Sequence, residues 1–147
     1  MTVIPVCGTN KKLFERMKAL KSSDEVTYIP TAFADNMLEL QAASDIFCGK
    51  SGNILAESTF FGNPSVVTHY ANMIEHNIAD HYINTVGCTI KEFSPQKTAD
   101  LMCSFAKNKS LIEPYVRAAK AYHANFGAEE AADTLWEFIK KNYPEVE

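Results

Sequence analysis

Short apolar runs alternate with amphipathic stretches along the first 92 residues, and this alternation constrains the fold more than any other feature. The runs are rich in β-branched side chains, and most end at glycine or proline, as strands do. We expect strands at 3–7, 26–29, 45–48, 65–68 and 88–90. Helices are expected between them at 11–21, 37–43, 54–61 and 74–85. Strands that alternate with helices predict an α/β fold, with a parallel sheet covered by helices on both faces.

The sequence after residue 92 is expected to be helical. The first helix begins at Ser94 with a serine–proline pair, and the second begins near Ser110 and ends before Gly127. A third helix carries an apolar stripe made of Ala132, Leu135, Trp136, Ile139 and Tyr143. These helices predict a C-terminal tail that packs on the same domain.

The composition excludes several functional classes. With 147 residues, the chain is long enough for one domain with its own core. The formal net charge of −4 gives no basic surface field, so nucleic acid is not an expected partner. No apolar run approaches the roughly 18 residues of a membrane span, and the N-terminus lacks a secretory pattern. We therefore expect a cytoplasmic protein whose membrane contact, if any, is peripheral.

The four cysteines and four histidines show no metal-ligand spacing. No two cysteines form a CxxC pair, and each lies in or beside an apolar run, which favours reduced and buried thiols. His76 and His81 are too far out of phase to share one helical face. We therefore expect no metal ion in this domain.

Ser51-Gly52-Asn53 directly follows an expected strand and opens an expected helix. Ligands of parallel sheets bind outside the carboxyl ends of the strands, where free N–H groups and a helix dipole favour phosphate. The alternative interpretation is a plain strand-to-helix turn with Asn53 as the cap, which the turn alone favours. Neither a Walker sequence nor GxGxxG is present, so ATP and NAD have no specific support.

Other polar residues lie at the same expected edge. Glu57 lies four residues after Asn53, where a carboxylate can accept both hydroxyls of a ribose or simply favour the helix dipole. Glu75 and Asn77 begin the next helix and can bind sugar hydroxyls or be solvated. The segment 33–37 can form a wall for a flat base, or Phe33 and Met37 can pack inside.

Five segments, in this order, resemble motifs of one group of glycosyltransferases. They are the CGxNxxL-like turn at 6–13, the FxDxM and AxD pair at 33–37 and 43–45, the small-residue loop and acidic helix at 50–57, the GxP-like 62–64, and the QExxN-like 75–79. The family is the two-Rossmann (GT-B) glycosyltransferases of the family 28 type. It includes the peptidoglycan lipid-intermediate GlcNAc transferase and the mono- and diglycosyldiacylglycerol synthases.

The resemblance implies a donor-binding C-terminal half of a GT-B fold, with a Rossmann-like, doubly wound core at 1–92 and helices at 93–147. It implies that the backbone at Ala34 contacts uracil and that Ser51 and Gly52 bind the diphosphate. It also implies that Glu57 binds the ribose and that Glu75 and Asn77 approach the sugar. The remaining residues expected in this pocket are Gly8, Phe33, Met37 and Asn53. UDP-sugar would be a substrate, so no cofactor is implied.

The resemblance also implies a direct displacement at the anomeric carbon, with a hexose or hexosamine passing to a lipid or lipid-linked acceptor. The base would come from an N-terminal acceptor-binding domain, so no catalytic residue is assigned here and this chain alone is expected to be inactive. The alternatives are a soluble binding subunit of a split glycosyltransferase, an epimerase-like domain using His69 and His76, and an α/β domain without a ligand.

Three departures from the family pattern are visible. The loop from Lys50 to Glu57 is one residue short, and Ile74 stands where a glutamine is expected. The family's first strand and its glycine loop have no counterpart, because Val3 to Cys7 matches the second strand. That first strand is central in a doubly wound sheet. We therefore expect a second copy or an exchanged strand to fill its place.

Overall fold

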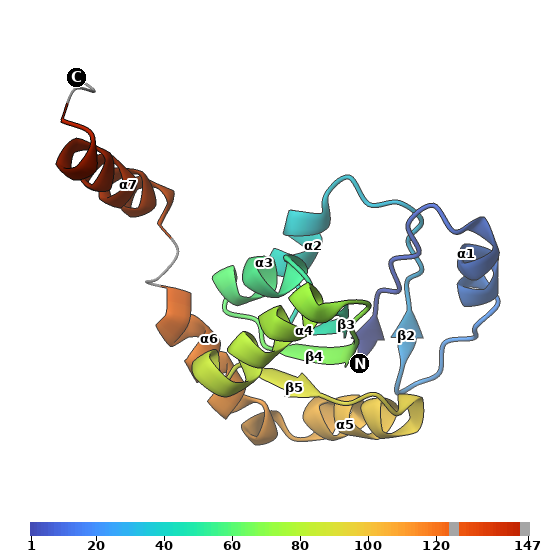
Figure 1. Ribbon diagram of the computed structural model, residues 1–147. Coiled ribbons are helices and arrows are strands. Elements are labelled where there is room, and N and C mark those ends of the chain that lie inside the picture. Colours follow the sequence, from blue (N-terminus) through green and yellow to red (C-terminus); the bar gives the residue numbers. More distant parts are fainter. Residues whose placement is uncertain (124–126, 145–147) are drawn as a thin grey trace.

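The computed structural model describes residues 1–123 and 127–144, which form an α/β fold with parallel strands and a helical C-terminal segment (Figure 1). The strands form two small parallel sheets, so the expectation of a single sheet is not met. One sheet joins β1 (Thr2–Val3) to β2 (Thr27–Tyr28). The other has the order β3 (Phe47–Lys50), β4 (Ser65–His69) and β5 (Thr89–Lys91).

Helices alternate with these strands as the sequence predicts. Before β5 they are α1 (Lys11–Lys18), α2 (Met37–Ala42), α3 (Ile54–Phe60), α4 (Met73–Asp80) and the π-helical η1 (His81–Val86). After it come α5 (Pro95–Lys107), the short 3₁₀ helix η2 (Lys109–Leu111), α6 (Glu113–Tyr122) and α7 (Ala128–Asn142). The expected end of the second C-terminal helix falls at 124–126, outside the described residues.

Two expected strands differ from the observed ones for local reasons. The strand expected at 45–48 lies at Phe47–Lys50, because pairing with the β4 side begins only where the Phe47 N–H donates to the Pro64 carbonyl. The strand expected at 3–7 is divided, because Pro5 has no N–H to donate to β2. Pairing resumes beyond it through a bridge between Val6 and Thr31.

The core lies around β4 and the helices that cover it. Its buried side chains are Leu55, Val67, Ala79, Tyr82, Cys88 and Ala119, from α3, β4, α4, η1, the residue before β5, and α6. Burial raises the pKa of the Tyr82 phenol to about 12. All four cysteines are free thiols, but Cys48 and Cys103 are exposed, so the expectation of buried thiols is wrong for these two.

The last helix, α7, stands apart from the sheets in Figure 1. Its expected apolar stripe is largely exposed, with Leu135 at 59% and Trp136 at 42%. In the described ranges, no helix combines the length and the apolar character needed to cross a membrane.

Candidate functional site

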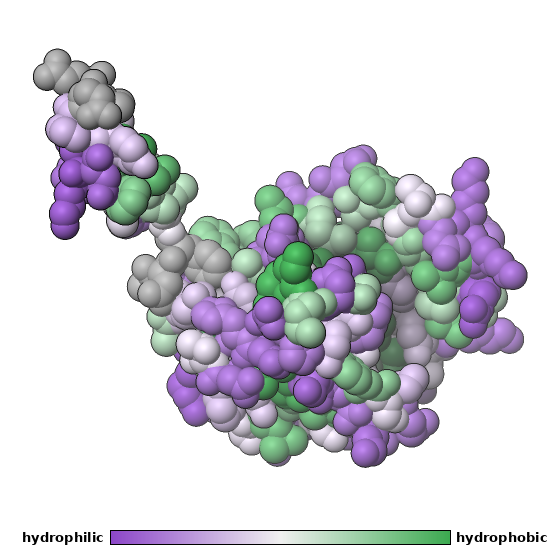
Figure 2. All heavy atoms as spheres, in the orientation of Figure 1, coloured by the Kyte–Doolittle hydropathy of each residue, from purple (hydrophilic) through white to green (hydrophobic). Residues whose placement is uncertain are grey.

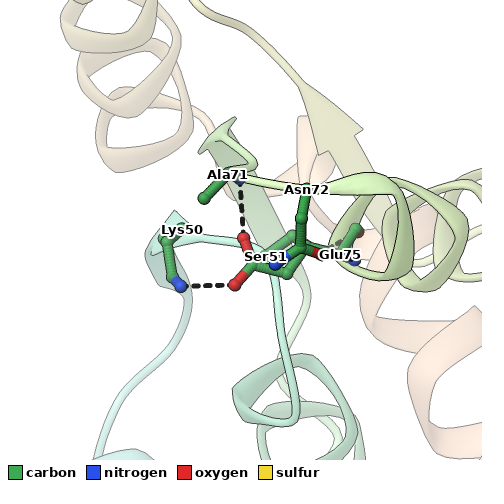
Figure 3. Close-up of polar contacts among 5 residues, drawn as sticks. All are labelled: Lys50, Ser51, Ala71, Asn72 and Glu75. Carbon is green, nitrogen blue, oxygen red and sulfur yellow. Dashed lines mark hydrogen bonds and ion pairs between the residues drawn. The ribbon is translucent and has the colours of Figure 1, made fainter.

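Two turns meet at the carboxyl ends of β3 and β4, and Ser51 joins them (Figure 3). Its N–H donates to the His69 carbonyl (3.0 Å) and continues the β3–β4 ladder by one bond. Its hydroxyl donates to the Glu75 carbonyl in α4 (2.7 Å), and its side chain is almost fully buried. Ser51 therefore fixes the loop after β3 against the first turn of α4, and both of its donors are engaged.

The Glu75 carboxylate at this edge forms an ion pair and accepts a backbone hydrogen bond. Its Oε1 lies 2.5 Å from Lys50 Nζ, and its Oε2 accepts from the Ala71 N–H at 2.7 Å. The Glu75 N–H donates to Asn72 Oδ1, so Asn72 caps α4. The ion pair with Lys50, followed by the Ala71 hydrogen bond, lowers the pKa of Glu75, so the carboxylate stays ionised at neutral pH.

Gly52 gives the turn before α3 its open shape. Its φ is +151°, a conformation that other residues rarely adopt, and a Cβ built there meets nothing within 4 Å. In the described part of the chain, the N–H groups of Gly52 and Asn53 donate to no protein acceptor. Asn53 stands at the N-cap position of α3, but it forms no side-chain cap hydrogen bond, so this part of the alternative interpretation is not met. These two N–H groups are therefore available to an anion.

Glu57 is held from the side by Gln41, a residue that the sequence analysis missed. Gln41 Nε2 donates to Glu57 Oε2 at 2.8 Å, and Gln41 is only 5% exposed. Asn63 in turn donates to the Gln41 carbonyl. The sequence offered one sign of this role: Gln41 lies four residues after Met37, so both are on the same face of the expected helix. This network fixes one carboxylate oxygen of Glu57, while Oε1 accepts no hydrogen bond among the described residues.

Six of the ten residues predicted for the pocket line one cavity of about 1910 Å³. They are Gly8, Met37, Ser51, Gly52, Asn53 and Glu75. The other four, which are Phe33, Ala34, Glu57 and Asn77, do not line it. Phe33 is 65% exposed, so it is not packed inside. Gly8 N–H donates to the Ala32 carbonyl (3.0 Å), which places the first turn beside the segment that carries Phe33 and Ala34.

Within the described part of the chain, the two histidines named for an epimerase contact other residues and not each other. His76 packs edge-on against Tyr70 and lies 3.5 Å from Asp80 Oδ2. His69 is the last residue of β4 and accepts the Ser51 N–H through its backbone carbonyl. Residues 1–123 and 127–144 contain no group of three or more acidic, histidine or cysteine side chains able to hold a metal.

The Ala71 N–H provides a direct readout of Glu75 ionisation. Because the folded-state pKa of Glu75 is lowered, this contact stabilises the fold above the unfolded pKa of about 4.3 and is lost as the pH falls through the lowered value. We expect the Ala71 amide shift, followed by NMR, to titrate below about 4.3. Lys50→Met removes the largest cause and should raise the midpoint. Equal midpoints in both proteins would contradict this account.

Chemically, the edge combines two free N–H groups and one lysine with two carboxylates held at fixed positions. Free N–H groups at a glycine turn favour phosphate oxygens, and fixed carboxylates favour vicinal hydroxyls. The sequence matches no protein-family model, and no curated protein is significantly similar to it, so no family is assigned to the chain by comparison.

Proposed function

We propose that this chain is a donor-binding domain of a glycosyltransferase and binds a UDP-sugar at the carboxyl ends of β3 and β4. The observation that carries the proposal is the Gly52 turn, with two free N–H groups and open space in front of it. The turn lines the same cavity as Glu75 and the Gly8 turn. The finer fold proposed with it is a Rossmann-like, doubly wound core of the GT-B type.

The diphosphate would lie at the Gly52 turn. Backbone N–H groups can approach phosphate oxygens closely where no Cβ intervenes, and Gly52 provides such a position. Lys50 immediately precedes Ser51, and its side chain is half-exposed. Charge on a departing UDP would be stabilised by these fixed dipoles, without a proton transfer from this chain.

The ribose and the sugar would lie on either side of the diphosphate. Glu57 Oε1 is free among the described residues to accept a ribose hydroxyl, because Gln41 occupies only Oε2. Glu75 can accept hydroxyls of the sugar on the remaining lone pairs of its oxygens. The base of the transfer step would come from an N-terminal acceptor-binding domain, so we expect binding of UDP but no glycosyl transfer by the chain alone.

Calorimetry with UDP tests the proposal. We expect saturable binding that Glu57→Ala weakens about tenfold or more, because a hydrogen bond to a charged group contributes about 1.5–3 kcal/mol. Glu137→Ala is the matched control, since this glutamate lies on α7 with its side chain 73% exposed and does not line the cavity. Absence of UDP binding would overturn the proposal. Equal weakening by both substitutions would remove the ribose role from Glu57.

A further inference from the structure

The first sheet has an unpaired backbone edge that Pro5 does not interrupt. In a parallel strand, alternate residues direct their N–H and C=O groups to opposite sides. The carbonyls of Val3 and Pro5 accept hydrogen bonds from the β2 side, at 2.9 Å each. The backbone groups of Thr2, Ile4 and Val6 therefore point to the other edge. Because the missing N–H of Pro5 falls on the paired side, the free edge keeps its full alternation of donors and acceptors.

The second sheet has a matching free edge on β3. The N–H groups of Phe47 and Ser51 donate to the β4 side, at 3.0 Å each. By the same alternation, the backbone groups of Cys48 and Lys50 point away from β4. In the part of the chain that the structure describes, β1 pairs only with β2 and β3 only with β4, so no strand lies against these outward-pointing groups. The N–H groups of Ile4 and Val6 donate to no backbone acceptor there.

Both free edges line the 1910 Å³ cavity. Ile4 and Val6 border it from the first sheet, Ile46 from the approach to β3, and Met102 and Phe105 from α5. Figure 2 shows the surface hollowed between the right-hand lobe, which carries α1, and the rest of the molecule, with hydrophobic side chains beside the hollow. An occupant of this cavity thus meets apolar side chains together with two rows of backbone donors and acceptors.

Two buried polar atoms in the cavity wall lack a partner. Gln41 Oε1 and Ser58 Oγ accept and donate no hydrogen bond within the described residues, and Gln41 and Ser58 are 5% and 0% exposed. Both residues line the cavity. Buried polar groups in folded proteins are nearly always paired. Each of the two atoms has almost no accessible surface, so an occupant reaches them only if the cavity wall rearranges.

We propose that this cavity binds an extended, apolar polypeptide strand from a partner protein, inserted between β1 and β3. The strand hydrogen-bonds to Thr2, Ile4 and Val6 on one side and to Cys48 and Lys50 on the other. It joins the two sheets into one sheet of order β2-β1-strand-β3-β4-β5. A polypeptide fits better than a small molecule, because donors and acceptors repeat along both edges at strand spacing. The inference does not depend on UDP binding, since it rests on other backbone groups.

Hydrogen exchange with a probe peptide tests the insertion. The probe is a capped peptide of about seven residues, with a valine-rich centre between lysines that keep it soluble. We expect the amides of Thr2, Ile4, Val6, Cys48 and Lys50 to exchange at least about tenfold more slowly with saturating peptide. The matched control is the same peptide with every backbone nitrogen of its valine-rich centre methylated, which removes the donors toward both edges and should give no protection.

A second experiment excludes weak affinity of the free peptide as the reason for missing protection. The same segment, fused to residue 1 through a glycine–serine linker, has an effective concentration in the millimolar range. Failure to protect the edge amides in both arms would overturn the proposal. It would also be overturned if the protein alone already protects these amides, together with a dimer mass in ultracentrifugation, because a second copy would then be the occupant.

Discussion

Leu55→Ala is expected to lower the free energy of unfolding by about 2–5 kcal/mol. Leu55 is fully buried on α3 and belongs to the core cluster that includes Val67, Tyr82 and Cys88. Truncation removes buried methyl groups and leaves a cavity that a close-packed interior fills only in part. Urea denaturation followed by far-UV circular dichroism measures the loss. Tryptophan fluorescence is unsuitable, because Trp136 lies on α7 and outside this cluster.

The matched control for Leu55→Ala removes the same atoms from an exposed position. Leu135→Ala on α7, where the side chain is 59% exposed, should change the free energy of unfolding by no more than about 0.5 kcal/mol. If Leu55→Ala leaves too little folded protein to measure, Leu55→Met keeps the volume and should cost less than about 1.5 kcal/mol. Equal losses for Leu55→Ala and Leu135→Ala would place the core elsewhere.

The order and type of the elements were predictable because each carries its own local signal. Asn10, Asn72 and Ser94 precede amphipathic stretches, and each accepts a hydrogen bond from the first turn of the helix that follows. Apolar runs rich in β-branched residues became strands where those residues could be buried, as at Ser65–His69. These signals depend on neighbours in sequence, so one sequence is sufficient to read them.

The division into two sheets was not predictable from periodicity. A strand pattern shows that a segment is extended, but it carries no information about which strand lies beside it. Cys48 illustrates this limit. Its apolar run predicts a buried strand, but Cys48 is exposed and lines the cavity.

The candidate site was predictable in part for the same reason. The Ser51-Gly52 turn and Glu75 were found because turns after strands have a local signature. Gln41 was missed because its role depends on Glu57, which lies 16 residues away in sequence. The engagement of both Ser51 donors was also invisible, since it requires the placement of α4 against β3. Long-range pairing therefore decides which of the predicted polar groups are free to bind a ligand.

Gly52→Ala is expected to weaken UDP binding by at least about tenfold, or 1.4 kcal/mol. Gly52 has φ +151° and faces open space, so a methyl group there meets no protein atom but occupies the position where a phosphate oxygen would approach. The unfavourable backbone conformation should also lower the free energy of unfolding, by about 1–3 kcal/mol. Calorimetry with UDP and urea denaturation measure the two effects separately.

Gly87→Ala separates the loss of binding from the loss of stability. Gly87 also has positive φ (+76°) and nothing within 4 Å of a built Cβ, but it ends η1 and does not line the cavity. Gly87→Ala should therefore lower the free energy of unfolding about as much as Gly52→Ala does, and leave the affinity for UDP unchanged. If both variants lose UDP binding, the effect comes from strain in the fold. If both retain it, the Gly52 turn does not approach the phosphate, and the diphosphate must be placed elsewhere along the carboxyl ends of the strands.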